Sequence, residues 1–178
     1  MNSFQDYPGT LQHQHLLEAV VTYYANDPRI LAVIVFGSLG RGNWDPYSDL
    51  DLDILIADGV NINIIHELEL LFNSLTDIGE HAALIIPDGE DAGNIVLKSL
   101  MGLSIRYHPL CSTSPNIVDS MVVLSGRIDE ATIKTAGLAN QQVKDTPLSR
   151  IVDMCVRYAV ETDRALQRRQ VWLAIEIE

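Results

Sequence analysis

The stretch FGSLGRGNWDPYSDLDLD, residues 36–53, joins two predicted strands. The first strand is LAVIVF at 31–36, a continuous apolar run with several β-branched residues, which is typical of a buried strand. The second is LDLDILIA at 50–57, in which aspartates alternate with leucines before the run becomes apolar. Gly37 and Ser38 end the first strand. Carboxylates therefore occupy alternate positions of a strand that is otherwise suited to burial, which indicates a chemical role for them.

Three aspartates lie on one face of the second predicted strand. Residues two apart in a strand point the same way, so Asp49, Asp51 and Asp53 share a face, with Cα atoms about 6.5 Å apart. Neighbouring carboxylates repel one another unless a cation or strong solvation offsets their charge. Mg²⁺ takes oxygen ligands and completes its shell with water and substrate phosphate. The alternation therefore predicts a site for a hard cation.

The turn that precedes the aspartates carries groups suited to phosphate. A tight turn at Gly37 and Ser38 exposes backbone N–H groups, which bind phosphate oxygens well. Arg41 follows in the same loop and adds a positive charge. Cation-binding and phosphate-binding groups are therefore expected side by side.

The order Gly-Ser, ten residues and Asp-x-Asp resembles the signature of the DNA polymerase β-like nucleotidyltransferase superfamily. More narrowly, FGSLGRGNWDPYSDLDLDILI is similar to the small-molecule and minimal nucleotidyltransferases, a group that includes the aminoglycoside adenylyltransferases. The resemblance is sharp over about 31–57 and looser over 81–128. It implies a mixed sheet flanked by helices, two Mg²⁺ ions, and ATP or another NTP as substrate. Transfer of a nucleoside monophosphate to an acceptor hydroxyl then releases pyrophosphate.

The resemblance assigns roles to individual residues. It makes Asp49 and Asp51 the catalytic, metal-binding pair, and it gives the triphosphate to Gly37 and Ser38. Many family members have an apolar residue where this chain has Asp53. That residue is a supplementary ligand, a solvated residue beyond the site, or a partner for a nearby arginine.

The family usually adds a third carboxylate from a neighbouring strand, in an apolar-Asp-apolar-His pattern. The best local match is LSIRYH at 103–108, where Arg106 stands in place of the acid and His108 shares its strand face. Arginine stays protonated and cannot ligate Mg²⁺, so it would bind a phosphate or pair with Asp53. The base or third ligand would then come from elsewhere, and the available acids are Glu67, Glu80, Asp88, Glu90 and Asp91.

The remaining pattern predicts an α+β head over residues 1–128 and a helical segment over 129–178. Periodicity and Gly or Pro breaks predict helices over 10–26 and 62–77, strands over 81–86 and 122–128, and a hairpin turning at Met101-Gly102, with a helix over 91–101 as its alternative. His13 and His15 are expected as surface residues of the first helix. The last helix, from about Pro147, carries late apolar residues that need a partner. They predict either that the protein continues beyond Glu178 or that this helix forms a homodimer.

Composition narrows the class of protein. Nearly half of the residues are apolar, which allows a substantial core, and no apolar run is long enough to span a membrane. The opening sequence lacks the basic and apolar regions of a signal peptide, so a cytoplasmic protein is expected. A formal net charge of −12 argues against nucleic acid as a partner. It suits a cationic substrate, or an anionic one whose charge is carried by a metal.

Together with these observations, the resemblance implies a Mg²⁺-dependent nucleotidyltransferase that moves AMP from ATP to a small-molecule hydroxyl. One alternative is a nucleotide-binding or regulatory module that kept the fold and lost the chemistry, and its motivation is Arg106. Another is a nucleotidyltransferase that modifies a protein, as antitoxin members of the superfamily do.

Overall fold

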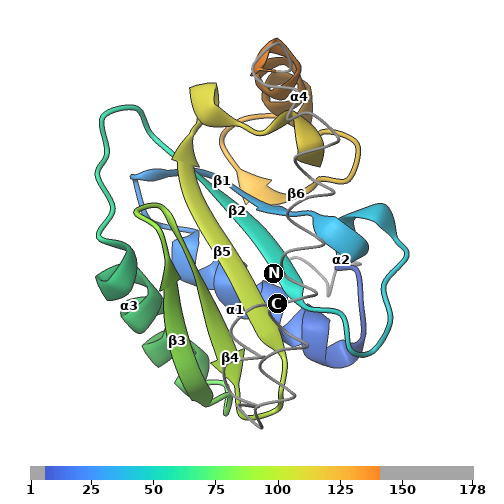
Figure 1. Ribbon diagram of the computed structural model, residues 1–178, viewed down its shortest axis with the longest axis vertical. Coiled ribbons are helices and arrows are strands. Elements are labelled where there is room, and N and C mark those ends of the chain that lie inside the picture. Colours follow the sequence, from blue (N-terminus) through green and yellow to red (C-terminus); the bar gives the residue numbers. More distant parts are fainter. Residues whose placement is uncertain (1–6, 141–178) are drawn as a thin grey trace, which may run out of the picture. The chain divides into compact units, whose positions relative to one another are not determined.

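The structure is a computed structural model that describes residues 7–140. In that range the chain forms one sheet with helices packed around it (Figure 1). In chain order the elements are α1 (Leu11–Tyr24), β1 (Ile30–Val35), α2 (Gly37–Arg41), β2 (Leu50–Ile56), α3 (Ile64–Thr76), β3 (Ala82–Asp88), β4 (Ala92–Leu97), β5 (Gly102–Pro109), two short 3₁₀ turns (Leu110–Ser112 and Pro115–Ile117), β6 (Val122–Gly126) and α4 (Glu130–Ala139).

The sheet has the strand order β3-β4-β5-β2-β1-β6. Strands β2 and β5 run parallel, and the other neighbouring pairs run antiparallel. The predicted α+β class with a mixed sheet is therefore confirmed. The two strands joined by the glycine-rich stretch, β1 and β2, lie side by side near the middle of the sheet, so the motif is surrounded by ordered structure.

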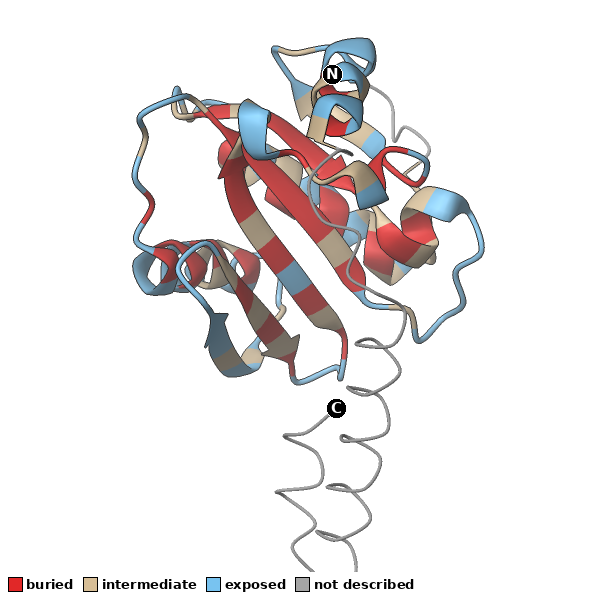
Figure 2. Cartoon of the chain, turned by 45° about the horizontal axis from the view of Figure 1, so that its top comes forward, coloured by how far each residue is buried: buried red, intermediate tan, exposed pale blue. Residues whose placement is uncertain are grey.

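Helices α1 and α3 cover one face of the sheet, and the larger part of the core lies beneath them (Figure 1). Leu50, Leu52 and Ile54 of β2 point into this core, where they meet apolar residues of both helices such as Leu17 and Leu68. Side chains alternate across a strand, so the aspartates of β2 point to the other face. Figure 2 shows the central strands largely buried, whereas the edge strand β3 carries mostly exposed residues.

A smaller apolar cluster lies on the face that carries the aspartates. Ile34 of β1, Leu55 of β2 and Ile133 of α4 are all buried in it. The side chain of Asp129 accepts a hydrogen bond from the backbone N–H of Thr132 and caps α4, as expected for a helix that begins there. Helix α4 lies in the same compact unit as the sheet, and the expected boundary after residue 128 stays a prediction.

Most elements agree with the predictions from sequence, and three points differ within residues 7–140. The hairpin of β4 and β5 is present, so the alternative helix over 91–101 is wrong. The expected loop after Gly37 begins with the short helix α2. Strand β3 continues through Pro87, where the prediction had ended it. Proline is tolerated there because β3 is an edge strand, and its open side has no neighbouring strand that would need the missing N–H.

The predicted last helix and its role in a homodimer lie outside the described residues. Within residues 7–140, no helix has the length and apolar character needed to cross a membrane.

Candidate functional site

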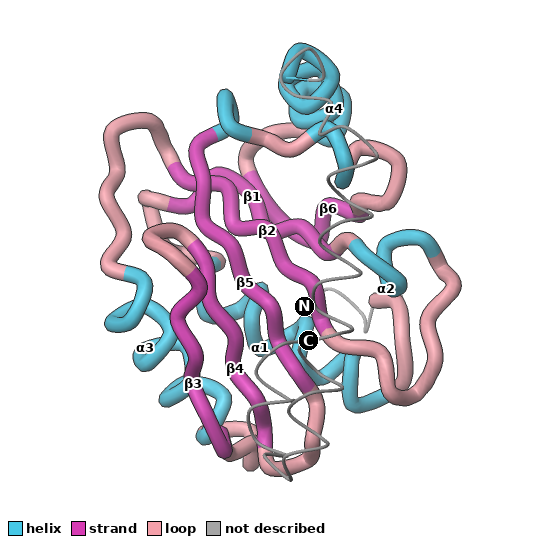
Figure 3. The backbone as a smooth tube through the Cα atoms, viewed as in Figure 1, coloured by secondary structure: helices cyan, strands magenta, loops and turns pink. Residues whose placement is uncertain are grey.

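The Gly-Ser turn lies beside the beginning of β2 because β1 and β2 are antiparallel. Val35, the last residue of β1, pairs with Leu52, and the backbone N–H of Phe36 donates to the carbonyl of Asp51 at 3.0 Å. Helix α2 therefore begins next to the strand end that carries the aspartates, as the tube in Figure 3 shows. The two halves of the motif, ten residues apart in the chain, form one site.

Gly37 is in direct contact with the carboxylate of Asp51. Its φ of +66° lies in the left-handed region, and a Cβ at this position would overlap Oδ2 of Asp51. Only glycine combines this backbone conformation with so close an approach. Gly40, one turn later, faces the backbone carbonyl of Ser120, which likewise leaves no room for a Cβ. Gly37 thus allows the turn to lie against Asp51, and Gly40 allows it to lie against the backbone at Ser120.

Asp49 and Asp51 form a carboxylate pair at the beginning of the central strand β2. Oδ1 of the exposed Asp49 accepts a hydrogen bond from the N–H of Gly102 at 2.9 Å, which ties it to the start of β5. Asp51 is half-buried. Its pKa is raised first by burial and then by the charges of Asp49 and Asp53, while Arg41 acts in the opposite direction. A bound cation would relieve this repulsion, so the pair fits a hard metal ion whose other ligands are water and phosphate.

The predicted phosphate-binding residues surround the same carboxylates. The first-turn N–H groups of α2, which include those of Ser38 and Leu39, have no partner within the helix. Arg41, in the last turn of α2, is exposed and close enough to Asp51 to affect its pKa. The structure therefore gathers Gly37, Ser38, Arg41, Asp49 and Asp51 into one site.

Asp53 lies on the same face but in different surroundings. It is fully buried, and its two oxygens accept hydrogen bonds from Nε and Nη2 of Arg106 at 2.9 and 2.8 Å. His108 brings Nε2 to 3.2 Å from Oδ2 of Asp53. Burial raises the pKa of the Asp53 carboxyl, but His108 and Arg106 outweigh this, and the pKa lies below its usual value. Of the three alternatives for Asp53, the structure places it as the partner of an arginine.

The remaining acids do not join Asp49 and Asp51. Glu67 is buried on the helical side of the sheet, where it accepts hydrogen bonds from Arg29 at 2.9 and 3.1 Å. Across the described part of the chain, no three or more His, Cys, Asp or Glu side chains are grouped so that they could hold a metal ion. The described residues thus supply two carboxylates for a metal, and the third acid expected from the resemblance is absent among them.

His13 supports the site in a way that the sequence did not indicate. It is fully buried, so the expectation of a surface residue is wrong for His13, whereas His15 is exposed. Its Nδ1 accepts the backbone N–H of Thr10 at 2.9 Å, which leaves Nε2 as the donor to the carbonyl of Ser48 at 2.7 Å. This bond fixes the residue before Asp49. A single histidine in a helical pattern carries no signal for such a contact.

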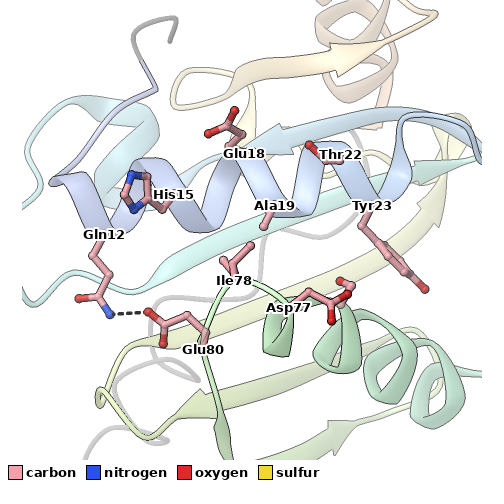
Figure 4. Close-up of a pocket in the computed structure, with 10 residues that line it drawn as sticks. Gln12, His15, Glu18, Ala19, Thr22, Tyr23, Asp77, Ile78 and Glu80 are labelled. Atoms are coloured by element: carbon pink, nitrogen blue, oxygen red, sulfur yellow. Dashed lines mark hydrogen bonds between the residues drawn. The ribbon is translucent and has the colours of Figure 1, made fainter.

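A separate groove of about 680 Å³ lies on the outer side of α1 and the end of α3 (Figure 4). It is lined by Gln12, His15, Glu18, Ala19, Thr22, Tyr23, Ser74, Asp77, Ile78 and Glu80. Glu80, one of the alternative acids, accepts a hydrogen bond there from Gln12 at 3.2 Å. The residues of the carboxylate site are not among those that line this groove, so Glu80 serves a different surface.

Comparisons with known proteins match the region that contains the site. Residues 18–94 match the family model "Polymerase beta, Nucleotidyltransferase". A comparison with curated proteins finds no match.

Solved structures also resemble the chain. One is a crystal structure of a toxin–antitoxin with AMP-PNP, with 18% identity over 79% of this chain and 98% of that chain and a TM-score of 0.46. Another is a cytoplasmic RNA terminal U-transferase, with 15% identity over 91% of this chain and 44% of that chain and a TM-score of 0.41. A third is an aminoglycoside 6-adenyltransferase from Bacillus subtilis, with 12% identity over 99% of this chain and 62% of that chain and a TM-score of 0.37.

Proposed function

Residues 18–94 match the model of the polymerase beta nucleotidyltransferase family, and on this premise we propose a specific reaction for the chain. It transfers AMP from ATP to a hydroxyl group of a small molecule in the presence of Mg²⁺. The acceptor oxygen bonds to the α-phosphorus as the bond from that phosphorus to the α,β-bridging oxygen breaks. Pyrophosphate leaves, and the hydroxyl proton passes to water.

The observation that carries the proposal is the contact between Asp51 and Gly37. In this contact, a carboxylate suited to a cation lies against a turn suited to phosphate. A nucleoside triphosphate binds together with a metal cation, so its site needs both kinds of group. Asp49 lies on the same side, fixed by the N–H of Gly102. A turn that served only to connect two strands would need neither the carboxylate pair nor the close approach of Gly37 to Asp51.

Each residue of the site has a distinct task in this proposal. Asp49 and Asp51 hold Mg²⁺, while the backbone N–H groups at Gly37 and Ser38 orient the β- and γ-phosphates. Arg41 adds positive charge at the exposed edge. When bound, Mg²⁺ stabilises negative charge on the attacking and leaving oxygens.

The acceptor is proposed to be a cationic small molecule with free hydroxyl groups, such as an aminoglycoside. The net charge of −12 favours the approach of a cation and disfavours a nucleic-acid backbone.

Calorimetry and turnover together test the proposal. ATP is titrated with and without Mg²⁺, and pyrophosphate release is then measured over a panel of aminoglycosides and other hydroxyl compounds, with a purified protein acceptor included. Asp51→Asn should abolish release while the far-UV circular dichroism spectrum stays unchanged. Unchanged turnover in that variant would contradict the mechanism.

A second candidate is a nucleotide-binding module without transferase chemistry. The observation that favours it is the ion pair of Arg106 with Asp53, because the family's third carboxylate is not found among the described residues. This candidate predicts Mg²⁺-dependent ATP binding with no pyrophosphate release against any acceptor.

A further inference from the structure

We propose that Arg106 is a phosphate-binding residue of the carboxylate site and that Asp53 positions it instead of binding metal. The inference rests on the proposed function, since it takes the phosphate to be that of the nucleotide. It is carried by the geometry of the buried ion pair, by its surroundings and by the register of β2 and β5.

Asp53 has no free oxygen for a cation. Its side chain is fully buried, Oδ1 accepts Nε of Arg106, and Oδ2 faces both Nη2 of Arg106 and Nε2 of His108. Nε2 of His108 lies close to this carboxylate but is not aligned with it as a hydrogen bond. The imidazole ring therefore fills the space beside Oδ2, and its Nε2 has no hydrogen-bond partner among the described residues. A metal ion would have to displace the side chains of Arg106 and His108 to reach Asp53.

Arg106 keeps one side of its guanidinium available. The pair with Asp53 uses Nε and Nη2, and Nη1 donates no hydrogen bond to any residue in the range 7–140. The Arg106 side chain is 34% exposed, whereas that of Asp53 is 0% exposed, so the arginine forms the outer member of the pair. A planar guanidinium held along one edge is pre-oriented for a phosphate on another edge, which lowers the entropy lost on binding.

The strand register puts this guanidinium next to the metal-binding pair. In the parallel ladder, Asp51 pairs with Ser104 and Asp53 pairs with Arg106. Side chains two apart share a face, and successive positions on it are about 6.5 Å apart. Arg106 therefore lies one step along β5 from the residue beside Asp51, on the same face of the sheet. That distance is within the span of a polyphosphate bound at Asp49 and Asp51.

Stability alone does not account for the pair. A buried ion pair is often no more stabilising than apolar residues of similar volume. The neighbouring positions on this face, Ile34 and Leu55, show that apolar residues are accommodated there. A charged pair whose cationic member reaches the surface beside a phosphate site is explained by anion binding.

The test separates phosphate binding from metal binding. Isothermal titration calorimetry measures the Kd of ATP and of adenosine in EDTA and in Mg²⁺, and the Kd of Mn²⁺ alone. The variants are Arg106→Gln, Asp53→Asn and Asp51→Asn. The control is Lys134→Gln, which removes one positive charge from an exposed pair with Glu130 on α4.

Arg106→Gln should weaken ATP binding roughly 10- to 100-fold, the range for loss of a hydrogen bond to a charged group. Its affinities for adenosine and Mn²⁺ should match those of the wild type. Asp53→Asn should weaken ATP binding in the same direction and leave Mn²⁺ affinity unchanged, whereas Asp51→Asn should lower Mn²⁺ affinity. Lys134→Gln should change none of these values.

Two results would overturn the inference: wild-type ATP affinity in Arg106→Gln, or a loss of Mn²⁺ affinity in Asp53→Asn as large as that in Asp51→Asn. If Arg106→Gln does not fold, Arg106→Lys keeps the charge, and its ATP affinity should fall less than 10-fold. A wild-type protein that binds ATP through Arg106 but releases no pyrophosphate would refute the proposed reaction and leave this inference standing. A wild-type protein that binds no ATP in either medium refutes both.

Discussion

Replacing Gly37 with alanine tests whether the turn and the carboxylates form one unit. Two separate costs are expected. An alanine at a φ of +66° loses about 1–2 kcal/mol relative to glycine, because the left-handed region brings its Cβ close to the backbone. The new Cβ also overlaps the carboxylate of Asp51, and a misfit of this kind in a packed site costs about 1–3 kcal/mol more.

Gly59 provides a matched control for the backbone term. Its φ is +78°, and a Cβ there would meet no atom within 4 Å. Gly59→Ala should therefore lose only the backbone part of the free energy of unfolding. Guanidinium denaturation gives this free energy for both variants, and calorimetry gives their Mn²⁺ affinities. Gly37→Ala should lose more stability than the control and should also bind Mn²⁺ more weakly.

The comparison has a clear negative result. If the two variants lose the same stability and both keep wild-type Mn²⁺ affinity, the carboxylate of Asp51 does not rest on Gly37. The phosphate-binding turn and the cation-binding carboxylates would then not form one unit.

Three further predictions concern residues around the site. His13→Leu removes the donor to the motif loop and should cost about 1–3 kcal/mol of unfolding free energy by denaturation, with wild-type stability contradicting the role. Hydrogen bonds from Arg29 lower the pKa of Asp27. The ionised Asp27 carboxylate therefore stabilises the fold above the ordinary carboxyl pKa, and this stabilisation is lost as the pH falls. The stability difference between wild type and Asp27→Asn should therefore shrink on acidification, and a constant difference would oppose this. Burial and then Glu67 raise the pKa of Tyr23 to about 12; in Glu67→Gln, phenolate absorbance should show a lower pKa, and an unchanged value would exclude the contact.

The parts of the fold that could be predicted are those set by local patterns. The apolar run of β1 and the alternation in β2 identify both strands. Asp27-Pro28 follows the end of α1, and Met101-Gly102 marks the start of β5, directly after the hairpin turn. The Gly-Ser turn and the aspartate pair are likewise close in sequence, so their proximity follows from two adjacent antiparallel strands.

The parts that could not be predicted depend on contacts between distant segments. His13 reaches the carbonyl of Ser48 across 35 residues, and nothing near it in sequence signals a buried donor. The short helix α2 also packs closely against a distant segment, because the carbonyl of Ser120 leaves no room for a Cβ at Gly40. Glycine-rich sequence by itself indicates a loop, and tertiary contacts override that tendency here.

The three alternating aspartates show why register decides chemistry in this sheet. Their spacing predicts one face and three equivalent carboxylates, and it cannot distinguish among them. The neighbouring strand does so: β5 places Ser104 beside Asp51 and Arg106 beside Asp53. A carboxylate next to a serine keeps its oxygens for a cation, whereas one held by a guanidinium uses them to orient that arginine. A shift of β5 by two residues along β2 would keep every side chain on its face and place Arg106 beside Asp51, so the roles of the aspartates on this face are set by strand pairing as well as by their spacing.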